Sequence, residues 1–233
     1  ERIDRFRPAA PAQAPAPLHV FLHGGYWQAM APGDFSFLAA GPNAAGEAFA
    51  VLGYPLCPRV SLDALAGAVA RGYGWLIERA AALGVGRGAV TVSGHSAGGH
   101  LAALLAQRGG PGGSPQDRPR SIARVLAVSG VFELEPLVHT PMNEALGLDA
   151  AAARRLSPVL HPPAPDVAFT AWVGGDESAE FRRQSRAMAA HWGDGGAPAS
   201  WHTVEGRNHF TVLETLYAPG GELAAGARAA RGP

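Results

Sequence analysis

The sequence has a single cysteine, no long apolar run and no excess of either charge. The lone cysteine, Cys57, excludes an intramolecular disulfide and any zinc site built from several cysteines. No apolar run reaches the roughly 18 residues of a membrane-spanning helix. Lys plus Arg total 19 and Asp plus Glu total 19, so the chain lacks the basic surface that binding to nucleic acid, or to a membrane by charge, requires.

The histidines also lack the spacing of metal ligands. None of the nine falls in an H-E-x-x-H pattern or a similar one, so we expect no bound metal. No motif typical of a cofactor site is present either, so we expect no cofactor. The segment Gly84–Gly88 looks like a nucleotide-binding loop but precedes its strand, whereas a phosphate loop follows a strand and opens a helix. The partner that we expect is a small-molecule substrate.

A chain of 233 residues, of which 47% are hydrophobic, is long enough for one domain with a large core. We therefore expect residues 1–233 to form a single domain. The chain begins at Glu1 without a charged and apolar leader, which makes the cytoplasm the default location. A trimmed N-terminus or a targeting segment removed earlier stays open.

Apolar strands alternate with helical periodicity along the chain, which predicts a mostly parallel sheet covered by helices on both faces. The predicted strands are Arg2–Arg7, Leu18–Leu22, Ala48–Tyr54, Ala89–Ser93, Ile122–Ser129, Val167–Val173 and Ala199–Val204. The predicted helices are Leu62–Leu83, capped by Ser61, then Ala97–Gln107, Met142–Gly147, Ala150–Leu156 and Ala179–Trp192. The Gly/Pro-rich stretch Gly109–Pro119 is expected to be a loop, and the tail from Gly220 to fray.

The pentapeptide GHSAG at residues 94–98 is the strongest functional signal. It matches G-x-S-x-G between an apolar strand and a helical segment, where a sharp turn exposes the serine in a strained backbone conformation. The residues two before and two after the serine must be small, because side chains there would collide across the turn. The N-terminus of the following helix favours developing negative charge. Ser96 is therefore the candidate nucleophile.

A serine hydroxyl is a weak nucleophile without a base, and after such a serine turn the acid and then the histidine follow beyond later strands. His209, within the segment Gly206–Phe210 after the last predicted strand, is the candidate base. His95 and His100, which flank the serine, are expected to be packing residues.

Two adjacent carboxylates follow the strand Val167–Val173 as candidates for the acid, Asp176 and Glu177. The acid holds the imidazole in one tautomer and stabilises its cation. In many hydrolases it comes three residues after the glycine that closes the strand, here Gly174, which favours Glu177. Aspartate is the commoner acid type, which favours Asp176. We favour Glu177 and keep Asp176 as the competing candidate.

An oxyanion hole is expected from the sequence HGGYW at residues 23–27, directly after a strand. A tetrahedral oxyanion needs two or three preorganised N–H donors, and glycines let the backbone approach the substrate. The candidate donors are the amides of Gly25, Tyr26 and Ala97, the last following the nucleophile.

Together these motifs resemble the kynurenine formamidase (arylformamidase) group of the α/β-hydrolases. The similar segments are HGGYW at 23–27, DFSFL at 34–38, YPLCP at 54–58, GHSAGGH at 94–100, SGVF at 129–132, EFRRQS at 180–185 and GRNHF at 206–210. The resemblance implies an α/β-hydrolase fold without a large cap domain. It also implies hydrolysis of N-formyl-L-kynurenine to L-kynurenine and formate in tryptophan breakdown.

The residues themselves specify only acyl transfer to water, so two other functions stay open. One is a general carboxylesterase of small acyl esters, and the other is an inactive hydrolase-fold binding module. An aromatic leaving group would need an aromatic wall, and its carboxylate a cationic partner. The candidates for the wall are Tyr26, Trp27, Phe132 and Phe210, and those for the cation are Arg207 and Arg59.

The sequence departs from the family in two places. Several family members carry Asp-Ser where this chain has Glu177-Ser178, which leaves the identity of the acid open. The family also has some tens of residues ahead of the region that matches Glu1–Pro8. Such a segment would cover substrate or form a dimer, and a homodimer is a candidate assembly.

Overall fold

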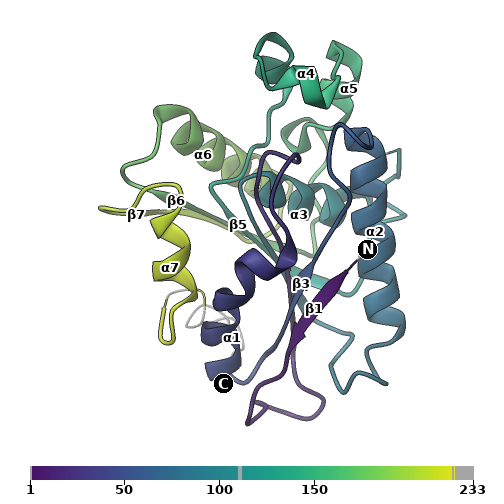
Figure 1. Ribbon diagram of the computed structural model, residues 1–233, viewed down its shortest axis with the longest axis vertical. Coiled ribbons are helices and arrows are strands. Elements are labelled where there is room, and N and C mark those ends of the chain that lie inside the picture. Colours follow the sequence, from purple (N-terminus) through teal and green to yellow (C-terminus); the bar gives the residue numbers. More distant parts are fainter. Residues whose placement is uncertain (1, 110–111, 222, 224–233) are drawn as a thin grey trace.

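Seven strands form one sheet within residues 2–109, 112–221 and 223, the part of the chain that the computed structural model describes. Their order across the sheet is β1-β3-β2-β4-β5-β6-β7 (Figure 1). The strands are β1 (Ile3–Phe6), β2 (Leu18–Leu22), β3 (Ala48–Leu52), β4 (Val90–His95), β5 (Ile122–Val128), β6 (Ala168–Gly174) and β7 (Ala199–Val204). β1 is antiparallel to β3, and the other neighbouring pairs are parallel.

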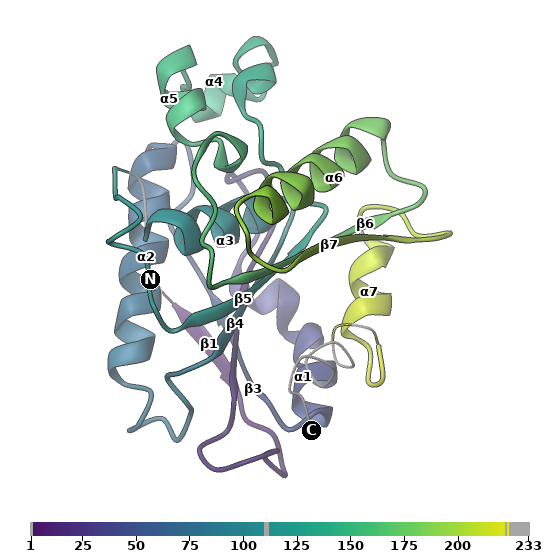
Figure 2. The same ribbon diagram turned by 180° about the vertical axis from the view of Figure 1, so that it is seen from behind.

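Helices cover both faces of this sheet (Figure 2). One face carries α2 (Leu62–Glu78), α3 (Ala97–Arg108) and α6 (Ala179–Asp194), and the other carries the 3-10 helix η1 (Pro32–Ala39), α1 (Ala40–Ala44) and α7 (Thr211–Tyr217). Four short helices lie between β5 and β6, namely η2 (Glu135–His139), α4 (Asn143–Leu146), α5 (Ala150–Arg155) and η3 (Pro158–Leu160). The predicted α/β-hydrolase architecture, a mostly parallel sheet between two helical layers, is confirmed.

The core divides into two clusters because successive strand side chains point to opposite faces. Along β2, Val20 and Leu22 belong to the cluster under α2, α3 and α6, whereas Phe21 belongs to the cluster under η1 and α7. All five residues of β2 are buried, as a central parallel strand covered on both faces requires. Because β2 to β7 run parallel to one another, their carboxyl ends lie at one edge of the sheet.

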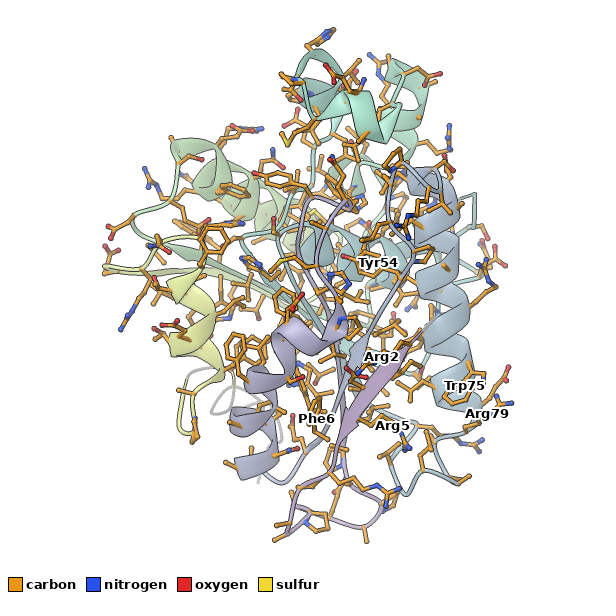
Figure 3. The ribbon with its side chains drawn as sticks, viewed as in Figure 1. Arg2, Arg5, Phe6, Tyr54, Trp75 and Arg79 are labelled. Atoms are coloured by element: carbon orange, nitrogen blue, oxygen red, sulfur yellow. The ribbon has the colours of Figure 1, made fainter. Side chains whose placement is uncertain are left out.

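The outer edge at β1 is cationic. A groove of about 570 Å³ opens between β1 and α2, lined by Ile3, Arg5, Arg71, Gly72 and Trp75. Arg5 of β1 and Trp75 of α2 face this side, and the guanidinium of Arg79 lies 4.6 Å from the centre of a Trp75 ring (Figure 3). This edge is remote in strand order from β6 and β7.

Among the described helices, none combines the length and the apolar composition needed to cross a bilayer. Within the same residues, no cluster of three or more His, Cys, Asp or Glu side chains is arranged to hold a metal ion.

The structure corrects some predicted boundaries. α2 ends at Glu78 and not at Leu83, because residues 79–84 continue as turns in which the Leu83 amide bonds the Arg79 carbonyl. Apolar spacing persists through those turns, so periodicity alone extends the helix too far. Most of the tail from Gly220, like residues 110 and 111 of the predicted Gly109–Pro119 loop, lies outside the described residues.

Candidate active site

Ser96 occupies a strained turn between β4 and α3. Its backbone angles are φ 54° and ψ −117°, and positive φ at a non-glycine residue costs about 1–3 kcal/mol. The turn is held because the Ser96 amide donates to the carbonyl of Val128, at 2.8 Å, at the end of the neighbouring strand β5. The residue is 2% exposed and stands at the N-terminus of a 12-residue helix.

The two glycines of the motif are sterically obligatory. A Cβ on Gly94 would lie 2.1 Å from the carbonyl oxygen of Gly98, and a Cβ on Gly98 would lie 1.9 Å from that of Leu22. Both contacts are with backbone atoms, so no side-chain rotation could relieve them. The predicted collision across the turn is therefore present at Gly94, whereas a side chain at Gly98 would collide with the end of β2.

Gly98→Ala is expected to lower the free energy of unfolding by about 3 kcal/mol or more, because the added methyl must displace the carboxyl end of β2. Gly74→Ala is the matched control, since Gly74 lies inside α2 and a Cβ added there would have no atom within 4 Å. It is expected to raise stability by about 0.5–1 kcal/mol. Urea unfolding measures both, and equal effects of the two substitutions would contradict the steric explanation.

Glu177, and not Asp176, contacts the imidazole of His209. The Nδ1 atom of His209 lies 2.7 Å from Oε2 of Glu177, whose side chain is 1% exposed against 20% for His209. Asp176 is exposed, and its backbone amide donates to the carbonyl of Arg207 at 3.0 Å. The residue that closes β6, Gly174, is three positions before the carboxylate that faces the ring.

The second oxygen of Glu177 is held by two further donors. Oε1 accepts from the hydroxyl of Ser129 at 2.5 Å and from the amide of Gly174 at 2.7 Å. Burial acts to raise the pKa of the Glu177 carboxyl, but hydrogen bonds from His209, Ser129 and Gly174 outweigh it and hold the pKa below its usual value. The carboxylate is therefore ionised beside the imidazole. Ser129 is not among the predicted site residues. Its signals are its place directly after β5, at the edge where Ser96 also lies, and the segment SGVF at residues 129–132.

The loop of residues 205–210, here called the base loop, contacts the serine turn through His95. The Nε2 atom of His95 lies 2.8 Å from the carbonyl oxygen of His209, and the two rings are 4.5 Å apart. The phenyl ring of Phe181 on α6 also lies 4.5 Å from the ring of His209. The structure thus brings together Ser96, Glu177 and the base loop, which are far apart in sequence.

The glycine-rich loop after β2 crosses the same edge. Gly25, Tyr26 and Trp27 all have positive φ, at 108°, 51° and 61°. A Cβ on Gly24 would lie 2.9 Å from Nδ1 of His95 and 3.4 Å from Cβ of Ser96, so this loop passes directly beside the serine. This loop and Ala97, the first residue of α3, therefore both lie beside Ser96, where the sequence predicts the oxyanion donors.

Comparison with known proteins agrees with this geometry. A family model described as the α/β-hydrolase fold matches residues 19–213. Kynurenine formamidase of Drosophila melanogaster is 32% identical over 214 residues, which span 85% of this chain and 68% of that protein. The chain belongs to the kynurenine formamidase group of the α/β-hydrolases. It is a hydrolase.

Two further relatives of this α/β-hydrolase cover most of its length. Kynurenine formamidase of Danio rerio is 28% identical over 221 residues, or 93% of this chain and 73% of that protein. The crystal structure of a candidate thioesterase from Silicibacter sp. TM1040 is 34% identical, with a TM-score of 0.82, and the match covers 96% of this chain and 79% of that one.

The predicted aromatic wall of this hydrolase is half wrong. Trp27 is 0% exposed and donates its indole N–H to Nδ1 of His100 at 3.2 Å, and Phe132 is 1% exposed and packs against Phe169. Both side chains belong to the core, since the Trp27 indole is bonded to the buried His100 and the ring of Phe132 lies against the bare Cα of Gly130. The remaining aromatic and cationic candidates are exposed, namely Tyr26, Phe210, Arg207 and Arg59.

The hydrolase contains a second Ser-His-Glu array that is closed off. Nε2 of His19 lies 2.6 Å from Oγ of Ser93, and its Nδ1 lies 3.5 Å from Glu47. Tyr217 of α7 donates to the same Ser93 hydroxyl at 2.8 Å. Ser93 is 0% exposed and lies inside the sheet, so no substrate reaches it. This array anchors α7 to β4.

The hydrolase is expected to become less stable in acid, because the buried side chains of His95 and His100 resist protonation. Burial lowers the pKa of His95 to about 3 and that of His100 to about 4. Between those values and the ordinary pKa of 6.5 the unfolded chain binds protons that the folded chain does not, so the free energy of unfolding falls as pH falls. We expect a loss of about 1.4 kcal/mol per pH unit for each of the two below about pH 6.

Urea unfolding from pH 7 to pH 4.5 measures this slope. His100→Gln is expected to reduce it by about one proton, because Gln does not titrate. An unchanged slope in that variant would contradict the assignment of the acid-sensitive protons to buried imidazoles.

Proposed function

We propose that this hydrolase cleaves aryl formamides, with N-formyl-L-kynurenine as its substrate and L-kynurenine and formate as products. The observation that carries the proposal is the 2.7 Å contact between Glu177 and His209 beside the Ser96 turn, in a chain of the kynurenine formamidase group. The kynurenine formamidases to which the chain is similar supply the substrate class, and the residues described above supply the chemistry.

Glu177 sets the protonation state of the base. Its ionised carboxylate accepts from Nδ1–H of His209, so Nε2 is left bare to take a proton. Ser96 Oγ forms a bond to the formyl carbon as its proton passes to Nε2. The carbonyl π electrons move to oxygen, where the amides of Gly25, Tyr26 and Ala97 stabilise the negative charge.

The intermediate collapses when the C–N bond breaks and His209 returns the proton to the leaving aniline nitrogen. This leaves a formyl ester on Ser96 and frees kynurenine. Water then attacks the ester with His209 again as base, and formate departs as the Ser96 oxygen regains its proton. A formyl group occupies almost no acyl space, whereas the aromatic leaving group needs a surface, for which Tyr26 and Phe210 are the exposed rings.

Ester hydrolysis is the second candidate function, because the same steps release an alcohol or a thiol. The structure from Silicibacter, at 34% identity, favours keeping it. The two candidates differ in the leaving group that the site accepts.

The test compares kcat/KM of the purified protein for N-formyl-L-kynurenine, p-nitrophenyl acetate and a short acyl thioester, with Ser96→Ala as the background. We expect the formamide to be preferred by at least about tenfold, which corresponds to roughly 1.4 kcal/mol of transition-state binding. Fast ester or thioester turnover with negligible formamide turnover would replace the proposed function by the second candidate. No turnover of any substrate and no labelling by a fluorophosphonate would favour the inactive binding module.

A further inference from the structure

The side chain of His95 touches the nucleophile turn, the base loop and the oxyanion loop. It is covalently next to Ser96, its Nε2 lies 2.8 Å from the carbonyl oxygen of His209, and its Nδ1 lies 2.9 Å from the place of a Cβ on Gly24. We propose that His95 is a positioning residue, whose Nε2–H holds the main chain of the base loop against the nucleophile turn. This inference rests on the triad assignment in the proposed function.

The hydrogen bond defines the tautomer of His95. A carbonyl oxygen only accepts, so Nε2 must carry the proton. The ring is 4% exposed, and burial, together with the nearby His209, holds the pKa of His95 well below its usual value. The hydrogen bond to the His209 carbonyl and the Glu177 carboxylate act in the opposite direction and do not outweigh burial, so the ring is neutral. A neutral ring is required at this place, because His209, 4.5 Å away, becomes a cation when it takes the serine proton.

The base loop needs such an anchor because its own surroundings are exposed. Residues 205–208 and 210 are exposed, and His209 itself is half-buried. Its carboxylate partner Glu177 holds the ring through Nδ1 and not the main chain. Asn208 folds that main chain into a local turn, because its Oδ1 accepts from the amides of Phe210 and Thr211, but this turn does not fix the distance to Ser96. A further anchor of this loop is the bond from the Asp176 amide to the Arg207 carbonyl, at 3.0 Å, which lies on the side of β6. His95 supplies the anchor on the side of the nucleophile.

Two contacts therefore divide the task of placing the base. Glu177 orients the imidazole, and His95 sets the distance between the base loop and Ser96, because its own backbone is one peptide away from the reacting hydroxyl. An error of about 1 Å in that distance is enough to cost about 10²-fold in rate. A histidine that merely fills space would lack this effect on rate.

The experiment compares His95→Gln, His95→Asn and His95→Phe. The amide nitrogen of Gln reaches the place of Nε2, that of Asn reaches only the place of Nδ1, and Phe keeps the ring without a donor. For p-nitrophenyl acetate and for fluorophosphonate labelling of Ser96, we expect His95→Phe and His95→Asn to lose about 10- to 100-fold in kcat or labelling rate, with KM within about twofold. His95→Gln is expected to recover activity to within about threefold of the wild type.

These probes do not need formamide specificity, so a protein that proves to be an esterase still tests the inference. Equal losses in His95→Gln and His95→Asn, or losses that follow the melting temperature, would overturn it. If Ser96→Ala keeps full labelling, the triad assignment fails instead.

Imidazole ¹⁵N NMR of the wild-type protein gives a measurement that no variant's folding can affect. We expect His95 to be neutral with the proton on Nε2 from pH 5 to pH 8. An Nδ1–H tautomer, or titration near pH 6.5, would overturn the proposal.

Discussion

Ser96→Ala is expected to lower kcat for the preferred substrate by about 10⁵- to 10⁶-fold, the largest effect of any single substitution in this chain. Without the hydroxyl there is no acyl-enzyme, and His209 and the oxyanion amides are left with water as the only nucleophile. The fold should persist, because the turn is held by the Ser96 amide and not by its side chain. Burst-phase kinetics and intact-mass detection of the formyl or acetyl adduct measure the loss.

Ser93→Ala is the matched control for this experiment. Ser93 also faces a histidine, at 2.6 Å, but it is 0% exposed within the second, closed array. Its loss should lower stability and leave kcat within about twofold of the wild-type value. An adduct that persists in Ser96→Ala and disappears in Ser93→Ala would reverse the assignment of the nucleophile.

Glu177→Gln is expected to lower kcat by about 10³- to 10⁴-fold, through the tautomer of the base. Ser129 and Gly174 both donate to Oε1, so the carbonyl oxygen of the new amide would take the place of Oε1 and accept from both. Its NH₂ group would then take the place of Oε2 and face His209. An NH₂ group presented to Nδ1 stabilises the tautomer with the proton on Nε2, which cannot accept the serine proton.

Asp176→Asn decides between the two adjacent carboxylates. The Asp176 side chain is exposed and the contact of that residue with the base loop is through its amide, so we expect kcat/KM within about twofold of the wild type. Steady-state kinetics of both variants settle the question. A larger loss in Asp176→Asn than in Glu177→Gln would make Asp176 the acid.

Much of the sheet could be predicted from sequence, because buried parallel strands are short apolar runs closed by glycine or proline. The predicted strand Leu18–Leu22, which is buried throughout, has the observed bounds. Ala199–Val204 also has the observed bounds, although it is the exposed strand at the edge of the sheet and its alternation of residue types, not its burial, indicates a strand. The helices η1 and α7 were not predicted. η1 begins at Pro32-Gly33, which reads as a turn, and α7 is only seven residues long and begins two residues after His209.

The serine turn was predictable for a steric reason, since only glycine fits at positions 94 and 98. The roles of side chains inside the site were not. Trp27 and Phe132 looked like wall residues because aromatic type says nothing about which way a ring turns. Ser129 and His95 act through single hydrogen bonds to distant residues, and no local pattern encodes a contact across 48 or 114 positions.

The connection between α3 and β5 separates the reacting groups into two stretches of chain. The oxyanion loop and Ser96 precede it, whereas Ser129, Glu177 and His209 follow it. A polypeptide cut at Gly112, where the backbone has positive φ and open space around it, would thus give two fragments that each hold half of the chemistry. Turnover would return only when β4 of one fragment pairs with β5 of the other. Two proteins fused to the fragments could therefore be tested for association by measuring hydrolysis.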